Sequence, residues 1–173
     1  MKNRIRNFIL EYSNRWAMKR LSRQEFDLPR PVKDILVLQK AENPMPLESQ
    51  KLLSDLFKIR SKQLRFLTLT NGFEIEETPQ HFILPRKQIN FRGLLPQKAQ
   101  EFCLKKPDVL INFFNTPDPL LIHLSINYPK ALRLGFTPVD PRINHIIFNF
   151  ELMDIDLFSV ELPKYIKPIL ASK

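Results

Sequence analysis

Short apolar runs alternate along most of the chain with segments that have helical spacing. Apolar runs that we expect to form strands cover residues 34–39, 64–69, 81–84, 107–114, 131–135 and 144–150. Between them, helices are predicted over 46–60, 96–106 and 120–128. Uninterrupted apolar strands are typical of parallel sheets, and their alternation with helices is typical of α/β folds. We therefore predict one Rossmann-like parallel sheet of about five or six strands flanked by helices.

The chain is expected to carry a further helix near each end. Residues 3–22 have an apolar stripe at helical spacing, formed by Ile5, Phe8, Ile9, Tyr12 and Trp16. The prolines at 29 and 31 then favour a stiff, extended linker. This divides the chain into an N-terminal helix with its linker, 1–31, and an α/β domain, 32–173. A last helix is predicted from Asp154, and the prolines at 163 and 168 are expected to kink or break it.

Composition excludes several kinds of catalytic and nucleotide-binding motif. The chain has only three glycines, which are too far apart for a dinucleotide-binding loop or a P-loop: Gly72, Gly93 and Gly135. It has no G-x-S-x-G motif. Its three histidines are too widely spaced for a metal-ligand motif: His81, His123 and His145. We therefore predict no metal and no cofactor, and we favour a non-catalytic role over an enzymatic one.

Positive charge is concentrated in the N-terminal segment. The net charge is +9, and residues 1–33 contribute nine Lys or Arg against three Asp or Glu. On the predicted helix, a basic face comprises Arg4, Arg6, Arg15, Lys19 and Arg20. A basic segment attracts the phosphates of nucleic acids and anionic lipids, although a basic face is also common on a helix that is simply solvated.

The apolar stripe of this helix needs a surface to cover it, and the sequence leaves four alternatives for that surface. The helix packs on its own domain, docks with a second copy or another protein, lies on an anionic membrane, or contacts nucleic acid. Of the three external partners, we expect a second copy or another protein rather than the membrane or nucleic acid.

The single cysteine of the chain bears on its location. The lone Cys103 cannot form an internal disulfide, which favours a reducing compartment and hence the cytoplasm, with peripheral membrane attachment as a further expectation.

A candidate ligand site follows from the predicted strand order. Parallel sheets bind ligands beyond the carboxyl ends of their strands. The polar residues expected at that edge are Lys40, Glu42, Asn43, Thr70, Asn71, Asn115, Thr116 and Asp118. Each of these residue types also serves turns or helix caps, which is the alternative interpretation.

The segment from Lys106 to Phe136 resembles one segment of the heptosyltransferase-like glycosyltransferases. The similarity rests on the strand 107–112, the Leu-rich helix 120–125 and the strand that ends in Gly135-Phe136, with Arg92-Gly93-Leu94-Leu95 before them. Those transferases carry a Gly-Asp turn after their first strand, whereas this chain has residues 40–44, KAENP, at that place. The chain also resembles a family of short uncharacterised bacterial proteins.

These observations favour a non-catalytic binding or protein-interaction domain. The resemblance implies one alternative, a half-domain of glycosyltransferase ancestry that binds a sugar or a nucleotide at the carboxyl edge of the sheet. The basic helix implies another, a peripheral protein that binds an anionic membrane or nucleic acid through residues 1–31.

Overall fold

The structure is a computed structural model that describes residues 2–72, 76–90 and 92–172. Six parallel strands form one sheet in the order β3-β2-β1-β4-β5-β6, which confirms the predicted α/β class. The strands are β1 (Ile35–Lys40), β2 (Leu64–Thr70), β3 (His81–Pro85), β4 (Val109–Phe113), β5 (Leu132–Phe136) and β6 (Ile146–Phe148). The helices are α1 (Lys2–Leu21), α2 (Leu47–Phe57), α3 (Gln97–Leu104), α4 (Pro119–Ile126) and α5 (Ile155–Ala171).

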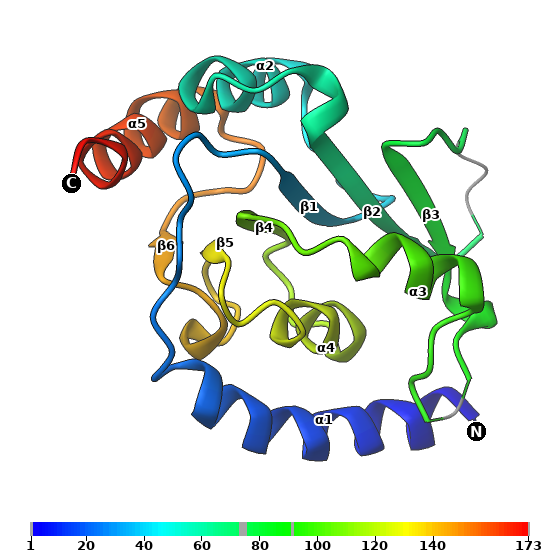
Figure 1. Ribbon diagram of the computed structural model, residues 1–173. Helices are drawn as coiled ribbons and strands as arrows, with labels where there is room; N and C mark the ends of the chain where they lie inside the picture. Colours follow the sequence, from blue (N-terminus) through cyan, green and yellow to red (C-terminus); the bar gives the residue numbers. More distant parts are fainter. Residues whose placement is uncertain (1, 73–75, 91, 173) are drawn as a thin grey trace.

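The helices cover the two faces of the sheet unequally. Helices α2 and α5 lie on one face, and α3 and α4 lie on the other, with α1 as a further layer outside α4 (Figure 1). The strands β1, β2, β4 and β5 consist almost entirely of buried residues. Alternating residues of these strands therefore enter two separate cores, one beneath each group of helices.

Helix α5 runs without interruption from Ile155 to Ala171, although it contains Pro163 and Pro168. Of the two expected effects, a kink or a break, the structure excludes the break. Its inner face buries Phe158, Leu162 and Ile166 against the sheet, at spacings of four residues that continue across Pro163. Because most helical stability in proteins comes from packing of an apolar face, this burial compensates for the backbone hydrogen bonds that the prolines remove.

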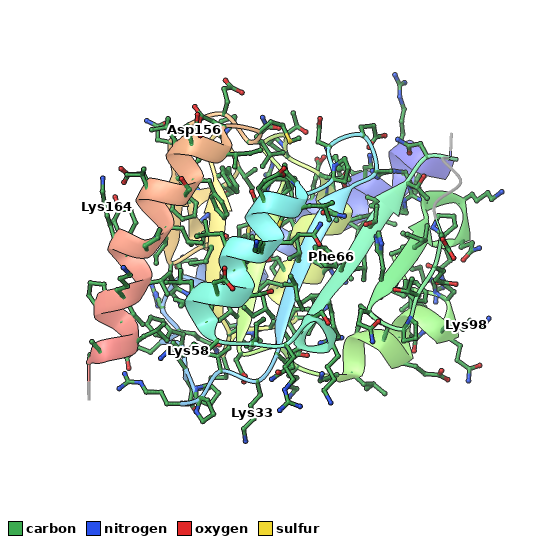
Figure 2. All side chains as sticks on the ribbon, turned by 90° about the horizontal axis from the view of Figure 1, so that it is seen from above. Lys33, Lys58, Phe66, Lys98, Asp156 and Lys164 are labelled. Atoms are coloured by element: carbon green, nitrogen blue, oxygen red, sulfur yellow. The ribbon has the colours of Figure 1, made fainter. Side chains whose placement is uncertain are left out.

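One part of the sheet lacks a helical cover. The connection from β2 to β3 spans residues 71–80, and its described residues form no helix. Figure 2 views the molecule from the α2 side and shows α2 and α5 lying beside, rather than over, the β2–β3 half of the sheet. This arrangement leaves a groove between α2 and β3.

Candidate functional site

The carboxyl ends of the strands bring several predicted residues together. The strand order changes direction between β1 and β4, which is where open α/β sheets bind ligands. There, Lys40 Nζ donates to the Thr116 hydroxyl at 2.7 Å and lies 3.9 Å from Asp118 Oδ2. Nearby, Asn71 Nδ2 donates to Glu42 Oε1 at 3.1 Å. Five of the predicted residues therefore take part in polar contacts at this edge.

Arg86 connects these contacts into one cluster, and sequence reasoning missed it. Its Nη2 donates to Asp118 Oδ2 at 2.5 Å, and its Nε donates to Asn71 Oδ1 at 3.0 Å. Arg86 follows Pro85, the last residue of β3, in the same way that polar residues follow β1 and β4. Applying the strand-end rule to the third strand as well would have found it.

The cluster satisfies much of its own charge. Asp118 pairs with both Arg86 and Lys40, and its Oδ1 also accepts a hydrogen bond from the backbone N–H of Leu120, which caps α4. The adjoining cavity, between the ends of β2 and β3, has a volume of about 220 Å³. Ligand pockets usually exceed about 300 Å³. The contacts at this edge therefore act mainly to join the ends of β1, β3 and α4.

Three of the predicted residues lie outside this cluster. Thr70 is buried, and its hydroxyl accepts a hydrogen bond from the backbone N–H of Gly72 at 3.2 Å. Asn43 and Asn115 form no side-chain hydrogen bond with any of the residues that the structure describes. Asn43 instead belongs to a backbone turn, because its N–H donates to the Lys40 carbonyl oxygen at 3.2 Å.

Arg6 does not belong to a solvated basic face, as the sequence suggested, because it is only 3% exposed. Its Nη1 donates to the carbonyl oxygens of Arg86 and Ile89, at 3.1 and 3.4 Å. Burial lowers the pKa of Arg6, and the positive charge of Arg86 lowers it further. Arg6 thus ties the first turns of α1 to the segment that follows β3.

Helix α1 packs through a face that its apolar residues alone did not indicate. The buried residues of the helix recur every three or four positions: Arg6, Leu10, Asn14, Met18 and Leu21. Two of them are polar. Arg6 donates through Nη1 to the segment that follows β3, whereas its buried Nε and Nη2 have no hydrogen-bond partner among the described residues. Asn14 Nδ2 donates to the Pro119 carbonyl oxygen at 2.9 Å, and Asn14 Oδ1 lies 3.1 Å from His123 Nδ1. These contacts hold the helix against α4.

The predicted apolar stripe consequently faces away from the protein. Its three aromatic residues are strongly exposed, with 71% for Phe8, 68% for Trp16 and 64% for Tyr12. Ile5 and Ile9 complete the stripe and are also exposed. Four basic residues of the same helix are exposed as well: Arg4, Arg15, Lys19 and Arg20. We call the five stripe residues and these four basic residues the outer face of α1.

The comparisons with known proteins identify a family. A family model described as "Family of unknown function (DUF6913)" matches residues 6–169. The chain belongs to this family. No curated protein and no solved structure matches the chain. Membership in DUF6913 agrees with the expected resemblance to an uncharacterised family, whereas the comparisons do not support the resemblance to heptosyltransferase-like enzymes.

Two kinds of feature are absent from the part of this DUF6913 protein that the structure describes. Over residues 2–72, 76–90 and 92–172, no helix is both long and apolar enough to cross a membrane. Over the same ranges, no group of three or more His, Cys, Asp or Glu side chains is placed to hold a metal ion.

Proposed function

We propose that this protein is a non-catalytic binding domain that attaches to an anionic membrane surface through the outer face of α1. The observation that supports this proposal most directly is the exposure of Phe8, Tyr12 and Trp16 on one side of one helix. Exposed aromatic residues in a contiguous group mark interaction sites on protein surfaces. Tyrosine and tryptophan are also the side chains enriched at membrane interfaces, where a ring meets both water and lipid.

The positions of the basic residues favour a lipid surface. With 3.6 residues per turn, Arg4 and Arg15 lie along one side of the apolar stripe, Arg20 lies along the other, and Lys19 lies near its C-terminal end. An apolar stripe flanked by cations is typical of helices that lie in the membrane interface. Each basic residue near an anionic leaflet contributes about 1 kcal/mol to binding.

The same charges disfavour a second copy of the chain as the occupant. Along the described part of α1, Glu11 is the exposed acidic residue that could pair with the four exposed cations. Two such faces packed together would oppose cations with cations, whether the helices ran parallel or antiparallel. An anionic lipid surface neutralises them instead.

The helix is also presented in a fixed position, as Figure 1 illustrates by the way α1 lies along α4. Its inner face is tied to the domain by Arg6 and Asn14. The aromatic residues therefore need no folding transition before they meet the membrane, which avoids the entropy cost of ordering a helix on binding.

Vesicle flotation tests the proposal, and the single tryptophan of the chain, Trp16, supplies a fluorescence signal on the same surface. We expect the protein to float with vesicles of phosphatidylcholine and phosphatidylserine but not with phosphatidylcholine alone. Added salt should weaken the binding. The Trp16 emission should shift to shorter wavelength as the indole leaves water.

A matched pair of variants makes the test specific. F8E/Y12E should abolish flotation, whereas L157E/V160E, which adds the same charge on the exposed side of α5, should leave it unchanged. The proposal is wrong if the wild-type protein does not float with the anionic vesicles. A dimer in native mass spectrometry that F8E/Y12E dissociates would identify a second copy as the occupant, and binding to polynucleotide alone would identify nucleic acid.

A further inference from the structure

A groove lies between α2 and β3, on the side of the sheet opposite α1. Its volume is about 640 Å³, which is within the usual range for small-molecule sites. Phe66, labelled in Figure 2, lies on β2 beside α2, and it lines the groove together with Leu64. Gln50, Lys51 and Ser54 line the groove from α2, and Gln80 and His81 line it from the β3 side.

A chain of hydrogen bonds fixes the orientation of His81 in this groove. The backbone N–H of Met45 donates to Gln39 Oε1 at 2.9 Å, which directs the Gln39 amide nitrogen towards Thr68. Gln39 Nε2 then donates to the Thr68 hydroxyl oxygen at 2.9 Å. That hydroxyl lies 2.7 Å from His81 Nε2. This series of hydrogen bonds runs from the end of β1 across β2 to the start of β3.

The donor-to-acceptor direction of these hydrogen bonds determines which ring nitrogen of His81 carries the proton. Thr68 is fully buried, and its oxygen already accepts a hydrogen from Gln39, so its own hydrogen must be donated to avoid a buried unsatisfied group. The available acceptor is His81 Nε2, which leaves the ring hydrogen on Nδ1. Burial lowers the pKa of His81 more than the charge of Glu77 raises it, which keeps the ring neutral. His81 is therefore a fixed N–H donor.

The charged side chains of the groove are cationic. Lys51 and Lys62 line it, and no Asp or Glu lines it among the residues that the structure describes. Neither lysine has an ion-pair partner within those residues. Two free ammonium groups, a neutral N–H donor and an apolar floor are complementary to an anion carried on a small organic body.

We propose that this groove binds a small phosphate ester of the size of a nucleotide or a sugar phosphate. Lys51 and Lys62 contact the phosphate, and the Nδ1–H of His81 donates to an oxygen of the same ligand. The body of the ligand packs over Leu64 and Phe66 and meets the amide of Gln50 or Gln80. The site is separate from the outer face of α1 and from the Lys40–Arg86–Asp118 cluster.

Calorimetric titration of the full chain with AMP, glucose 6-phosphate and inorganic phosphate tests the proposal, with adenosine and glucose as uncharged controls. We expect saturable binding of at least one of the two esters and no binding of the uncharged compounds. K51A/K62A should weaken that binding by about tenfold or more. K33A/K167A removes two exposed lysines outside the groove and should not change it.

NMR titration of the wild-type protein decides where the ligand binds without relying on a variant. Signals of Gln39, Thr68 and the His81 ring should move on addition of the ester, and the ring proton should be observed on Nδ1. The proposal is wrong if neither ester binds, or if K51A/K62A binds as tightly as wild type. It is also wrong if the shifts are confined to Lys40, Asn71 and Thr116, because the ligand would then occupy the carboxyl edge.

Discussion

At the scale of single residues, Gly93 shows how closely α1 approaches the domain. Its φ angle is +81°, in the region that favours glycine. A Cβ atom built on Gly93 would lie 2.5 Å from Cδ2 of Leu10, which is itself 1% exposed. The turn before it is closed by Asn90, whose carbonyl oxygen accepts a hydrogen bond from the Gly93 N–H at 3.1 Å. Gly93 thus fits the turn and clears space for Leu10.

We expect Gly93→Ala to lower the free energy of unfolding by about 2 kcal/mol or more, through backbone strain and overpacking against Leu10. Gly72→Ala is the matched control, because Gly72 also has a positive φ, +135°, but has no neighbouring atom within 4 Å of an added Cβ. Urea unfolding of both variants measures the difference. Equal losses in the two variants would contradict a specific contact between Gly93 and Leu10.

At the scale of secondary-structure elements, Arg133 and His145 hold the C-terminal end of α1. Arg133 is buried, and its guanidinium donates to the carbonyl oxygens of Leu21, Pro129 and Ile143. Burial lowers its pKa to about 10. His145 Nδ1 accepts from the Arg133 backbone N–H at 3.0 Å, which leaves Nε2–H to donate to the Gln24 carbonyl oxygen at 3.2 Å. This neutral form satisfies both ring nitrogens.

Acid should therefore destabilise the fold. Burial lowers the pKa of His145, and the nearby Arg133 charge lowers it further. Burial also lowers the pKa of His123, which contacts Asn14 of α1. Below about pH 6.5 the unfolded chain binds protons that the folded chain does not, so the unfolding free energy must fall as the pH decreases towards the folded pKa values.

Urea unfolding at about pH 7.5 and about pH 5.5 measures this effect. We expect a lower unfolding free energy at the acidic pH. The variant His145→Asn should be less stable than wild type at neutral pH but should lose less on acidification. A wild-type unfolding free energy that stays constant or rises on acidification would show that these histidines are not held neutral by the fold.

The positions of the helices and strands could be predicted from the sequence, whereas the face through which α1 packs against the domain could not. Apolar runs place all six strands within a few residues, and the reason is clearest for β1, β2, β4 and β5, which are buried on both faces and are therefore rich in apolar residues. The packing of α1 depends on Arg6 and Asn14, whose partners are backbone carbonyls of Arg86 and Pro119, far away in the chain. Spacing of apolar residues carries no information about such partners.

The candidate sites divide in the same way. Lys40, Thr116 and Asp118 could be placed at one edge because parallel strands end together. The groove lined by Lys51 and His81 could not be predicted, since it exists because the β2–β3 connection leaves that half of the sheet uncovered. The spacing of apolar residues predicts where a helix forms, but it does not predict which part of the sheet is left without a helix over it.

At the scale of the whole molecule, a charge cluster joins the elements at each end of the sheet. At the amino end, Arg65 of β2 forms a bidentate pair with Asp34, with Nη2 at 2.6 Å from Oδ2. The same guanidinium donates to the carbonyl oxygens of Phe102 and Lys105, at 3.0 and 2.7 Å, where α3 ends. Lys105 Nζ is a second cation, 2.5 Å from Asp34 Oδ1. This cluster ties β1, β2 and α3 together.

We expect Arg65→Met to lower the unfolding free energy by about 3–5 kcal/mol, since it leaves Asp34 buried with an incomplete partner and frees the α3 carbonyls. The exposed Lys105 compensates only in part, because a half-solvated ammonium is screened by water. Arg142→Met removes a comparable bidentate pair with Asp140 at the surface and should cost about 1 kcal/mol or less.

The double variant D34N/R65M separates the two causes of this loss. If the unpaired charge of Asp34 dominates, replacing that carboxylate with a neutral amide should restore more than half of the stability lost in Arg65→Met. If the hydrogen bonds from Arg65 to the end of α3 dominate, the double variant should remain as unstable as the single one. Hydrogen exchange would then show faster exchange of the α3 amides in both variants. A cost for Arg65→Met as small as that of Arg142→Met would mean that neither link joins these elements.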